Sequence, residues 1–141
     1  MTTRCFATFS EAIAHSTGGW LRLPASASTV EQAQLDDAQL RARSAGALSN
    51  PLLGIEWWNY GYSGSSWTIY GQDGTGCYGG VTYGVHNVGS AWNDEISSAK
   101  GYSNCRSEHW EHADFNGAML LCICYSMGAM NDKTTSIRSR A

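Results

Sequence analysis

The chain has 141 residues, of which 43% are hydrophobic and 15% are charged, and its formal net charge is -3. This length predicts one domain, and 16 glycines with many aromatic residues favour a compact, turn-rich protein over a disordered one. A nucleic-acid surface needs clustered Lys and Arg, so the charge argues against one. No stretch is long and apolar enough to predict a membrane span.

The first 27 residues resemble a secretory leader only in part. Arg4 precedes a short apolar run, and Ala25-Ser26-Ala27 resembles a signal-peptidase site. Glu11 and His15 interrupt what should be an apolar core. A mis-chosen start or a degraded leader fits the segment equally well.

Residues 29–47 are rich in Glu, Gln, Asp, Ala, Leu and Arg, with a rough helical stripe. Thr29 is placed to cap a helix that begins at Val30. Few large apolar side chains are available to dock such a helix, so we expect a linker or pro-segment with fractional helix. Asn50-Pro51 marks the boundary, because proline restrains its own backbone and that of the preceding residue. Residues 1–50 are thus expected to be a poorly structured or partly helical leader, pro-segment or linker, and residues 51–141 the folded domain.

Beyond Leu52 the sequence predicts β-structure. Short runs at residues 54–58, 66–70, 81–85 and 118–125 are rich in β-branched and aromatic residues and are punctuated by glycine. Repeated short strands with turn signals predict an all-β sandwich.

A short oxygen-rich sequence occurs twice, as Asn93-Asp94-Glu95-Ile96-Ser97-Ser98 and as Asn131-Asp132-Lys133-Thr134-Thr135-Ser136. Its carboxylate, amide, hydroxyl and carbonyl oxygens are the hard donors that calcium prefers. Calcium takes about six to eight oxygens, so one copy must borrow ligands from the other, from a nearby loop or from water. The same residue types also build ordinary turns and caps. Two matching copies, each ending a similar module, favour metal binding.

The two modules that precede these hexapeptides open alike. Each has an aromatic residue, then a glycine after six intervening residues, with a second aromatic two residues before that glycine. The matching positions are Trp57, Tyr62 and Gly64 in the first module and Trp110, Phe115 and Gly117 in the second. The chain is therefore interpreted as an internal duplication.

This combined pattern resembles the βγ-crystallin Greek-key motif in its calcium-binding microbial form, over residues from about Gly54 to the C-terminus. The resemblance implies a two-motif Greek-key β-sandwich, with motif one at about 54–102 and motif two at about 103–141. It also implies that the hexapeptides form a double clamp around two calcium ions. We call residues 93–98 the first clamp and residues 131–136 the second clamp.

The resemblance also implies the ligands. Asp94 and Asp132 would give side-chain oxygens, Ser97 and Thr135 would give hydroxyls, and Glu95 and Lys133 would give backbone carbonyls. Further loop carbonyls would come from Trp58 and Glu111, and the clamps begin with the candidate metal residues Asn93 and Asn131.

Two features depart from the family pattern. The first module carries an insertion around residues 71–80, so its outline differs from that of the second. Lys133 occupies the position of Glu95, and a cation near the ion weakens metal binding. The two calcium sites are therefore expected to differ in affinity.

The cysteines predict disulfides. Apart from Cys5 in the leader-like segment, the chain has Cys77, Cys105, Cys122 and Cys124. Cys122 and Cys124 leave the same face of an extended strand, an arrangement poorly suited to a mutual bond. Each is expected to pair instead with Cys77 or Cys105. Two disulfides imply an oxidising compartment, whereas the alternative is free buried thiols in a cytosolic protein.

A zinc site is a rival interpretation of the C-terminal half. His109 and His112 lie near three cysteines in sequence, but at a spacing of three they face opposite sides of a strand. They also lack the helical arrangement of a metalloprotease. We therefore expect surface histidines.

Catalytic patterns are also weak. No Gly-x-Ser-x-Gly elbow occurs, and Glu108, Glu111 and Asp114 lie in one segment with no sign of a raised pKa. We expect no enzyme.

The sequence thus predicts a secreted bacterial calcium-binding protein, monomeric, with no nucleic-acid or membrane partner. The alternative is an inhibitor of a secreted protease, since some secreted bacterial metalloprotease inhibitors share the crystallin-like fold. Its reactive loop would be the insertion at residues 71–80, braced by Cys77, because a preordered loop loses less entropy on docking.

Overall fold

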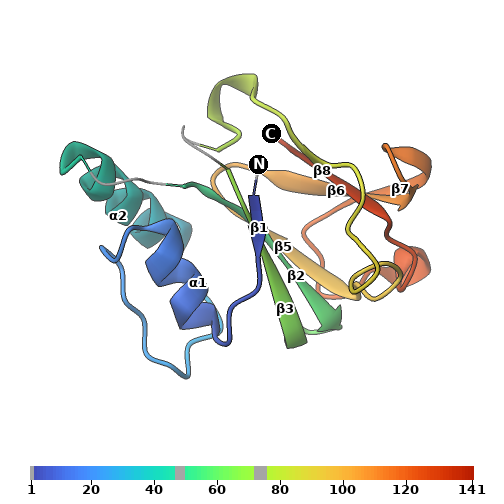
Figure 1. Ribbon diagram of the computed structural model, residues 1–141, viewed down its shortest axis with the longest axis horizontal. Helices are drawn as coiled ribbons and strands as arrows, with labels where there is room; N and C mark the ends of the chain where they lie inside the picture. Colours follow the sequence, from blue (N-terminus) through green and yellow to red (C-terminus); the bar gives the residue numbers. More distant parts are fainter. Residues whose placement is uncertain (1, 47–49, 72–75) are drawn as a thin grey trace.

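The computed structural model describes residues 2–46, 50–71 and 76–141 and arranges them mainly as two antiparallel β-sheets. The two sheets face each other, and two helices lie on the outer side of the first sheet (Figure 1). This architecture confirms the predicted all-β sandwich, and the N-terminal segment, which was expected to be poorly structured or partly helical, contains both α-helices.

Among the described residues, each sheet has four strands. The first sheet has the order β1-β3-β2-β5, with bounds Thr2–Arg4, Ser63–Tyr70, Leu52–Asn59 and Ser98–Gly101. The second has the order β4-β8-β6-β7, with bounds Tyr83–Val85, Ser136–Arg140, Arg106–His112 and Asn116–Cys122. The helical elements are α1 (Phe9–Ser16), α2 (Gln32–Ser44) and the 3-10 turns η1 (Tyr78–Gly80) and η2 (Gly128–Met130).

The two sheets exchange segments. Strand β4 lies between β3 and β5 along the chain, yet it pairs with β8 in the second sheet. Reciprocally, Cys124 follows β7 of the second sheet but pairs with Ala99 on β5 of the first. Neither half of the sandwich can therefore complete its sheet without the other, which is the crossing typical of paired Greek-key motifs.

The main core lies between the sheets. Trp67 and Ile69 are two residues apart on β3, so their side chains leave the same face of the strand. Both are buried in one cluster with Leu53 of the first sheet and Ile137 of the second. The hydrophobic runs that predicted strands thus supply the surface that joins the sheets.

The N-terminal segment is docked, which corrects the expectation of an undocked linker. Ile13, Val30 and Leu35 are buried in a second cluster with Ile55 and Trp57 of β2. Phe9, Leu21 and Leu23 are partly buried against the same cluster, so the segment supplies more apolar side chains than its helical stripe indicated. Within the described ranges, neither helix is long and apolar enough to cross a membrane.

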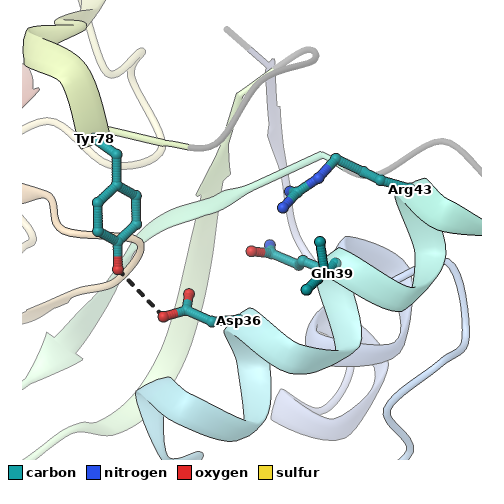
Figure 2. A pocket seen from close by; sticks show the side chains of 5 residues that line it. Asp36, Gln39, Arg43 and Tyr78 are labelled. Carbon is teal, nitrogen blue, oxygen red and sulfur yellow. Dashed lines mark hydrogen bonds between the residues drawn. The ribbon is translucent and has the colours of Figure 1, made fainter.

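Polar contacts also hold α2 to the domain. The helix begins at Gln32, not at Val30, and Thr29 does not cap it. The backbone N–H of Ser103 donates to the Gln32 side chain at 3.1 Å. Figure 2 shows the Tyr78 hydroxyl donating to the Asp36 carboxylate, at 3.2 Å. Burial and the charge of Asp36 raise the pKa of the Tyr78 hydroxyl.

The disulfide pairing differs from the prediction. Cys77 is bonded to Cys105, and Cys122 is bonded to Cys124. The prediction assumed an extended strand through Cys124, but β7 ends at Cys122 and the chain then crosses to the first sheet. The bend brings the two Cα atoms to 5.2 Å, within the usual range for a disulfide.

Docking of the N-terminal segment can be tested with two leucines of α2. Leu35 is fully buried whereas Leu40 is 56% exposed. We expect Leu35→Ala to lower the free energy of unfolding by about 2–5 kcal/mol, because it leaves a cavity against the sheet. The matched control Leu40→Ala should change it by less than about 0.5 kcal/mol. Urea denaturation measures both values, and equal small losses would show that the segment does not dock.

Candidate metal site

The two clamps occupy corresponding places in the two sheets. The first leads into β5, and the second leads into β8. Asp94 and Asp132, the second residue of each clamp, have positive φ values of 60° and 54°. Aspartate tolerates this left-handed conformation better than most residues, which explains a shared aspartate at this position.

Reciprocal backbone hydrogen bonds join the clamps. The N–H of Asp94 donates to the carbonyl of Thr134 at 3.2 Å, and the N–H of Asp132 donates to the carbonyl of Ile96 at 3.2 Å. Ile96 and Thr134 are both the fourth residue of their clamp. In each clamp, the second residue donates to the fourth residue of the other clamp. The two copies of the sequence repeat therefore lie side by side and are bonded in the same way.

The fifth clamp residues hold the motif aromatics. The N–H of Ser97 donates to the carbonyl of Trp57 at 2.9 Å, and that of Thr135 donates to the carbonyl of Trp110 at 2.8 Å. The predicted carbonyl ligands of Trp58 and Glu111 are each one residue further along the chain. The bonds thus keep both loop segments beside the clamps.

The sixth clamp residues, Ser98 and Ser136, have a structural role that the sequence analysis missed. Each hydroxyl donates to one carbonyl of the hairpin turn in its own module and accepts from one N–H of that turn. The Ser98 hydroxyl donates to the carbonyl of Asn59 at 2.6 Å and accepts from the N–H of Tyr62 at 3.1 Å. The Ser136 hydroxyl donates to the carbonyl of His112 at 2.6 Å and accepts from the N–H of Phe115 at 3.0 Å. The matching positions were visible in the repeat, but only the fold shows their partners.

One pair of predicted ligands comes together across the clamps. The Ser97 hydroxyl of the first clamp donates to the Asp132 carboxylate of the second at 3.2 Å. This juxtaposes two oxygen donors from segments 35 residues apart. Both oxygen types suit a hard cation such as calcium.

The remaining predicted ligands lie on the turns around this pair. Asp94, Glu95 and Lys133 are exposed at the surface, while Thr135 is half-buried. The N–H groups of Glu95 and Lys133 donate to equivalent carbonyls, those of Trp92 and Met130, at 3.2 Å each. Intermediate exposure is also found for the candidate residues Asn93, Asn131 and Glu111, whereas Trp58 is exposed.

The donor set fits calcium better than a transition metal. Among the residues that the structure describes, no three His, Cys, Asp or Glu side chains come together as a metal cluster. The candidate donors at the clamps are hydroxyl, carbonyl and carboxylate oxygens, which are the donors of calcium loops.

A pocket elsewhere contains none of the predicted ligands. It has a volume of about 320 Å³ and lies between α2 and η1, lined by Asp36, Gln39, Leu40, Arg43 and Tyr78 (Figure 2).

The expectation of surface histidines is wrong for His109. Its Nε2 lies 2.9 Å from a Glu56 carboxylate oxygen, and both side chains are fully buried. Side chains alternate between the two faces of a strand, and His109 is on the face of β6 that meets Glu56 of β2 in the other sheet. The partner is 53 residues away in sequence, so local spacing gave no sign of the pair. His112, three residues later, is exposed.

Glu108 also belongs to an ion cluster that the sequence did not indicate. Its buried carboxylate accepts from Arg138 at 2.6 Å and also from Arg140. Burial would raise the pKa of this carboxyl, but the hydrogen bonds and charges of the two arginines together lower it. The group is an ionised structural carboxylate, whereas a catalytic acid would need a raised pKa.

The insertion proposed as an inhibitory loop is described only in part. Residues 72–75 lie outside the described residues. At the C-terminal end of the insertion, Cys77 is bonded to Cys105, and its N–H donates to the carbonyl of Ser103 at 2.9 Å.

Comparisons with known proteins give likenesses in structure. No protein-family model matches the chain, and no curated protein matches it. A βγ-crystallin domain studied for the evolution of the eye-lens fold aligns with a TM-score of 0.50 at 17% identity, covering 67% of this chain and 91% of that one.

Two bacterial structures also align. A βγ-crystallin domain from Clostridium beijerinckii has a TM-score of 0.44 at 22% identity, covering 62% of this chain and 97% of that one. One from Flavobacterium johnsoniae has a TM-score of 0.44 at 24% identity, covering 63% and 94%. At these identities the likeness concerns the fold alone. The conclusion on the fold rests on the alignment with the domain studied for the evolution of the eye-lens fold, which has the TM-score of 0.50. The chain has a βγ-crystallin-like fold, as the repeat predicted.

The Glu108 cluster predicts a specific acid sensitivity. Because the folded pKa lies below the ordinary value of 4.5, the cluster's stabilisation is complete above that value and is lost as the pH falls through the folded pKa. We expect Glu108→Gln to flatten the loss of unfolding free energy between about pH 6 and about pH 3. Urea denaturation at several pH values measures the slope. The exposed Glu31→Gln variant is the control, and identical slopes in all three proteins would contradict the assignment.

Proposed function

We propose that this protein binds two calcium ions through its paired clamps and that the metal stabilises the folded state. The observation that carries the proposal is the contact between the Ser97 hydroxyl and the Asp132 carboxylate, 3.2 Å apart and from different clamps. An ordinary turn residue bonds its own neighbours. A hydroxyl and a carboxylate brought together from two repeats are better explained as parts of a shared coordination sphere.

The duplication suggests how the proposed ligands divide between the two sites. The first site takes the Ser97 hydroxyl, the Asp132 carboxylate and the carbonyls of Glu95 and Trp58. The second takes the equivalent groups, namely the Thr135 hydroxyl, the Asp94 carboxylate and the carbonyls of Lys133 and Glu111. Water completes each sphere, because four protein oxygens fall short of the roughly six to eight that calcium takes.

Calcium binding would reinforce the contact between the clamps. Each ion would hold a hydroxyl from one clamp and a carboxylate from the other, parallel to the backbone bonds between them. A ligand that binds the folded form alone stabilises it by RT ln(1 + [L]/Kd), or about 2.7 kcal/mol at a hundredfold excess over Kd.

We further propose that the protein is a secreted bacterial monomer without a catalytic, nucleic-acid or membrane function. The buried Cys77–Cys105 disulfide supports an oxidising compartment. Extracellular calcium concentrations suit even weak sites.

Inhibition of a secreted protease is the alternative function. Its support is the Cys77–Cys105 disulfide, which anchors one end of the insertion at residues 71–80 as the braced loop requires. Assays against secreted metalloproteases and serine proteases test this alternative directly.

The aspartates test the calcium proposal. We expect Asp94→Ala and Asp132→Ala each to remove most of the calcium-induced rise in melting temperature. Each variant loses the carboxylate of one site, and because each ion bridges the clamps, loss of that ion also loosens the clamp pairing on which the other site depends. Calorimetric calcium titration and thermal unfolding with calcium or chelator give the two readouts.

The matched control is Asp114→Ala. Asp114 also has a positive φ, 57°, and an exposed side chain, so it shares the turn chemistry and not the clamp. Its replacement should cost the same stability with calcium as with chelator. Two calcium sites of unchanged affinity in both Asp94→Ala and Asp132→Ala would contradict the proposal.

Lys133 tests the difference between the sites. We expect Lys133→Glu to tighten calcium binding about two- to fivefold, or roughly 0.4–1 kcal/mol, because an anion replaces an exposed cation beside the ion. The calcium affinity of Lys133→Gln should lie between those of the parent protein and the Glu variant. The gain in affinity should be smaller at high salt, which screens the charge. Calorimetric titration at two salt concentrations measures this, and weaker binding by the Glu variant would contradict it.

A further inference from the structure

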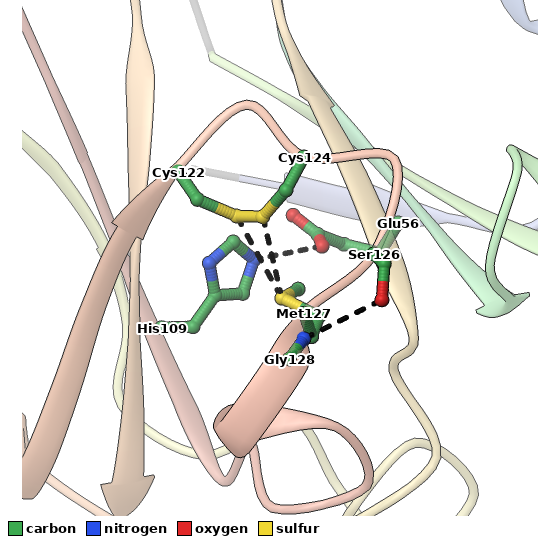
Figure 3. Close-up of a disulfide and its surroundings, with 7 residues drawn as sticks. All are labelled: Glu56, His109, Cys122, Cys124, Ser126, Met127 and Gly128. Carbon is green, nitrogen blue, oxygen red and sulfur yellow. Dashed lines mark hydrogen bonds and ion pairs between the residues drawn. A yellow bond between two sulfur atoms is a disulfide. The ribbon is translucent and has the colours of Figure 1, made fainter.

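Three sulfur atoms converge beside the core, and none of them belongs to a calcium ligand proposed above. The Sδ atom of Met127 lies 3.8 Å from the Sγ of Cys122 and 3.8 Å from the Sγ of Cys124 (Figure 3). Met127 is buried, and the two cysteines are half-buried. The cluster is thus enclosed on one side and reachable on the other.

Backbone pairing fixes the positions of these side chains. Cys122 ends β7 in the second sheet, where it pairs with Ser107. Cys124 exchanges two hydrogen bonds with Ala99 in the first sheet, at 2.8 and 2.9 Å. The N–H of Met127 donates to the carbonyl of Ser97 at 3.0 Å. The three sulfurs are therefore held by both sheets, so the site is preorganised by the sandwich.

The spacing and softness of the sulfurs suit a metal. Sulfur ligands about 2.3 Å from a metal ion lie roughly 3.8–4.0 Å from one another in tetrahedral or trigonal geometry. The Met127 thioether already has this separation from both cysteine sulfurs. Thiolates suit both Cu(I) and zinc, but the Met127 thioether favours Cu(I), because the usual protein ligands of zinc are Cys, His and carboxylate.

We propose that Cys122, Cys124 and Met127 form a cuprous-ion site that opens when the Cys122–Cys124 disulfide is reduced. A dithiol reductant supplies two electrons and two protons, which break the S–S bond and give two thiols, and the reductant becomes a disulfide. One Cu(I) then binds both sulfurs as thiolates, releasing the two protons, and the Met127 thioether completes the site. No metal redox change occurs in these steps.

Greater exposure makes Cys122–Cys124 the disulfide that a reductant should reduce first. Cys77 and Cys105 are 0% and 3% exposed, whereas Cys122 and Cys124 are half-buried. Thiol–disulfide exchange requires access of the attacking thiolate to a sulfur atom. A mild dithiol should therefore reduce Cys122–Cys124 first and leave Cys77–Cys105 intact. None of the three sulfurs is a proposed calcium ligand, so this inference does not rest on calcium binding.

The test is an anaerobic titration of the full chain with Cu(I), in competition with a chromogenic cuprous chelator. Cys5 is an exposed free thiol, so all proteins carry Cys5→Ser. Alkylation and mass mapping first establish that only Cys122 and Cys124 are reduced. We expect one Cu(I) per reduced chain, none per oxidised chain, and sulfur-only ligation by X-ray absorption.

Two methionines give a matched pair of variants. Met127→Leu conserves volume, so it should leave the melting temperature of the reduced apoprotein nearly unchanged. Met127→Leu should weaken Cu(I) binding by at least roughly tenfold, because even the loss of an outer-shell partner weakens metal binding by about that factor. Met119→Leu, at a 43% exposed position on β7, should bind like the parent.

Three outcomes would overturn the proposal. They are an absence of Cu(I) binding by the selectively reduced chain, equal affinity in the Met127→Leu and Met119→Leu variants, and preferential uptake of Zn²⁺ over Cu(I) at equal concentrations. Cys122→Ser and Cys124→Ser should each abolish one-to-one binding. If either serine variant fails to fold, the Cu(I) affinity of Met127→Leu compared with that of Met119→Leu still tests the proposal.

Discussion

The pair of backbone hydrogen bonds between the clamps is the constraint on which the rest of the site depends. Asp94 donates to Thr134 and Asp132 donates to Ile96, so each clamp satisfies a backbone group of the other. A buried or half-buried backbone group left without a partner costs stability, so the two turns are most stable together. The spatial pairing brings one hydroxyl to the opposite carboxylate and gives both repeats the same local geometry.

The strand exchange places the clamps where they can meet. Because β4 pairs with β8 and Cys124 pairs with Ala99, the chain of each module crosses to the other sheet before its clamp begins. Ser98 and Ser136 then tie the end of each clamp to the hairpin turn of its own module. The same crossing brings Cys122, Cys124 and Met127 together, so the oxygen-rich and sulfur-rich clusters are both consequences of one topology.

The sequence predicted features whose signals are local. Each hexapeptide, each aromatic-glycine opening and each short strand is contained in fewer than ten consecutive residues, and together these signals correctly indicated the fold. The Glu56–His109 pair was missed because its partners come from different sheets. The Cys122–Cys124 bond was missed because a bend at a strand end cannot be read from spacing. Docking of Leu35 was underestimated because the surface that covers it belongs to the domain and not to the segment.

Amide hydrogen exchange of Asp94 and Asp132, measured by NMR during a calcium titration, tests the central claim most directly. The backbone N–H groups of these residues form the two bonds between the clamps, and calcium bound across the clamps must slow the opening of both bonds. The account predicts that both amides gain protection together and lose it on chelation. Protection of one amide without the other, or exchange unaffected by calcium, would contradict a shared site.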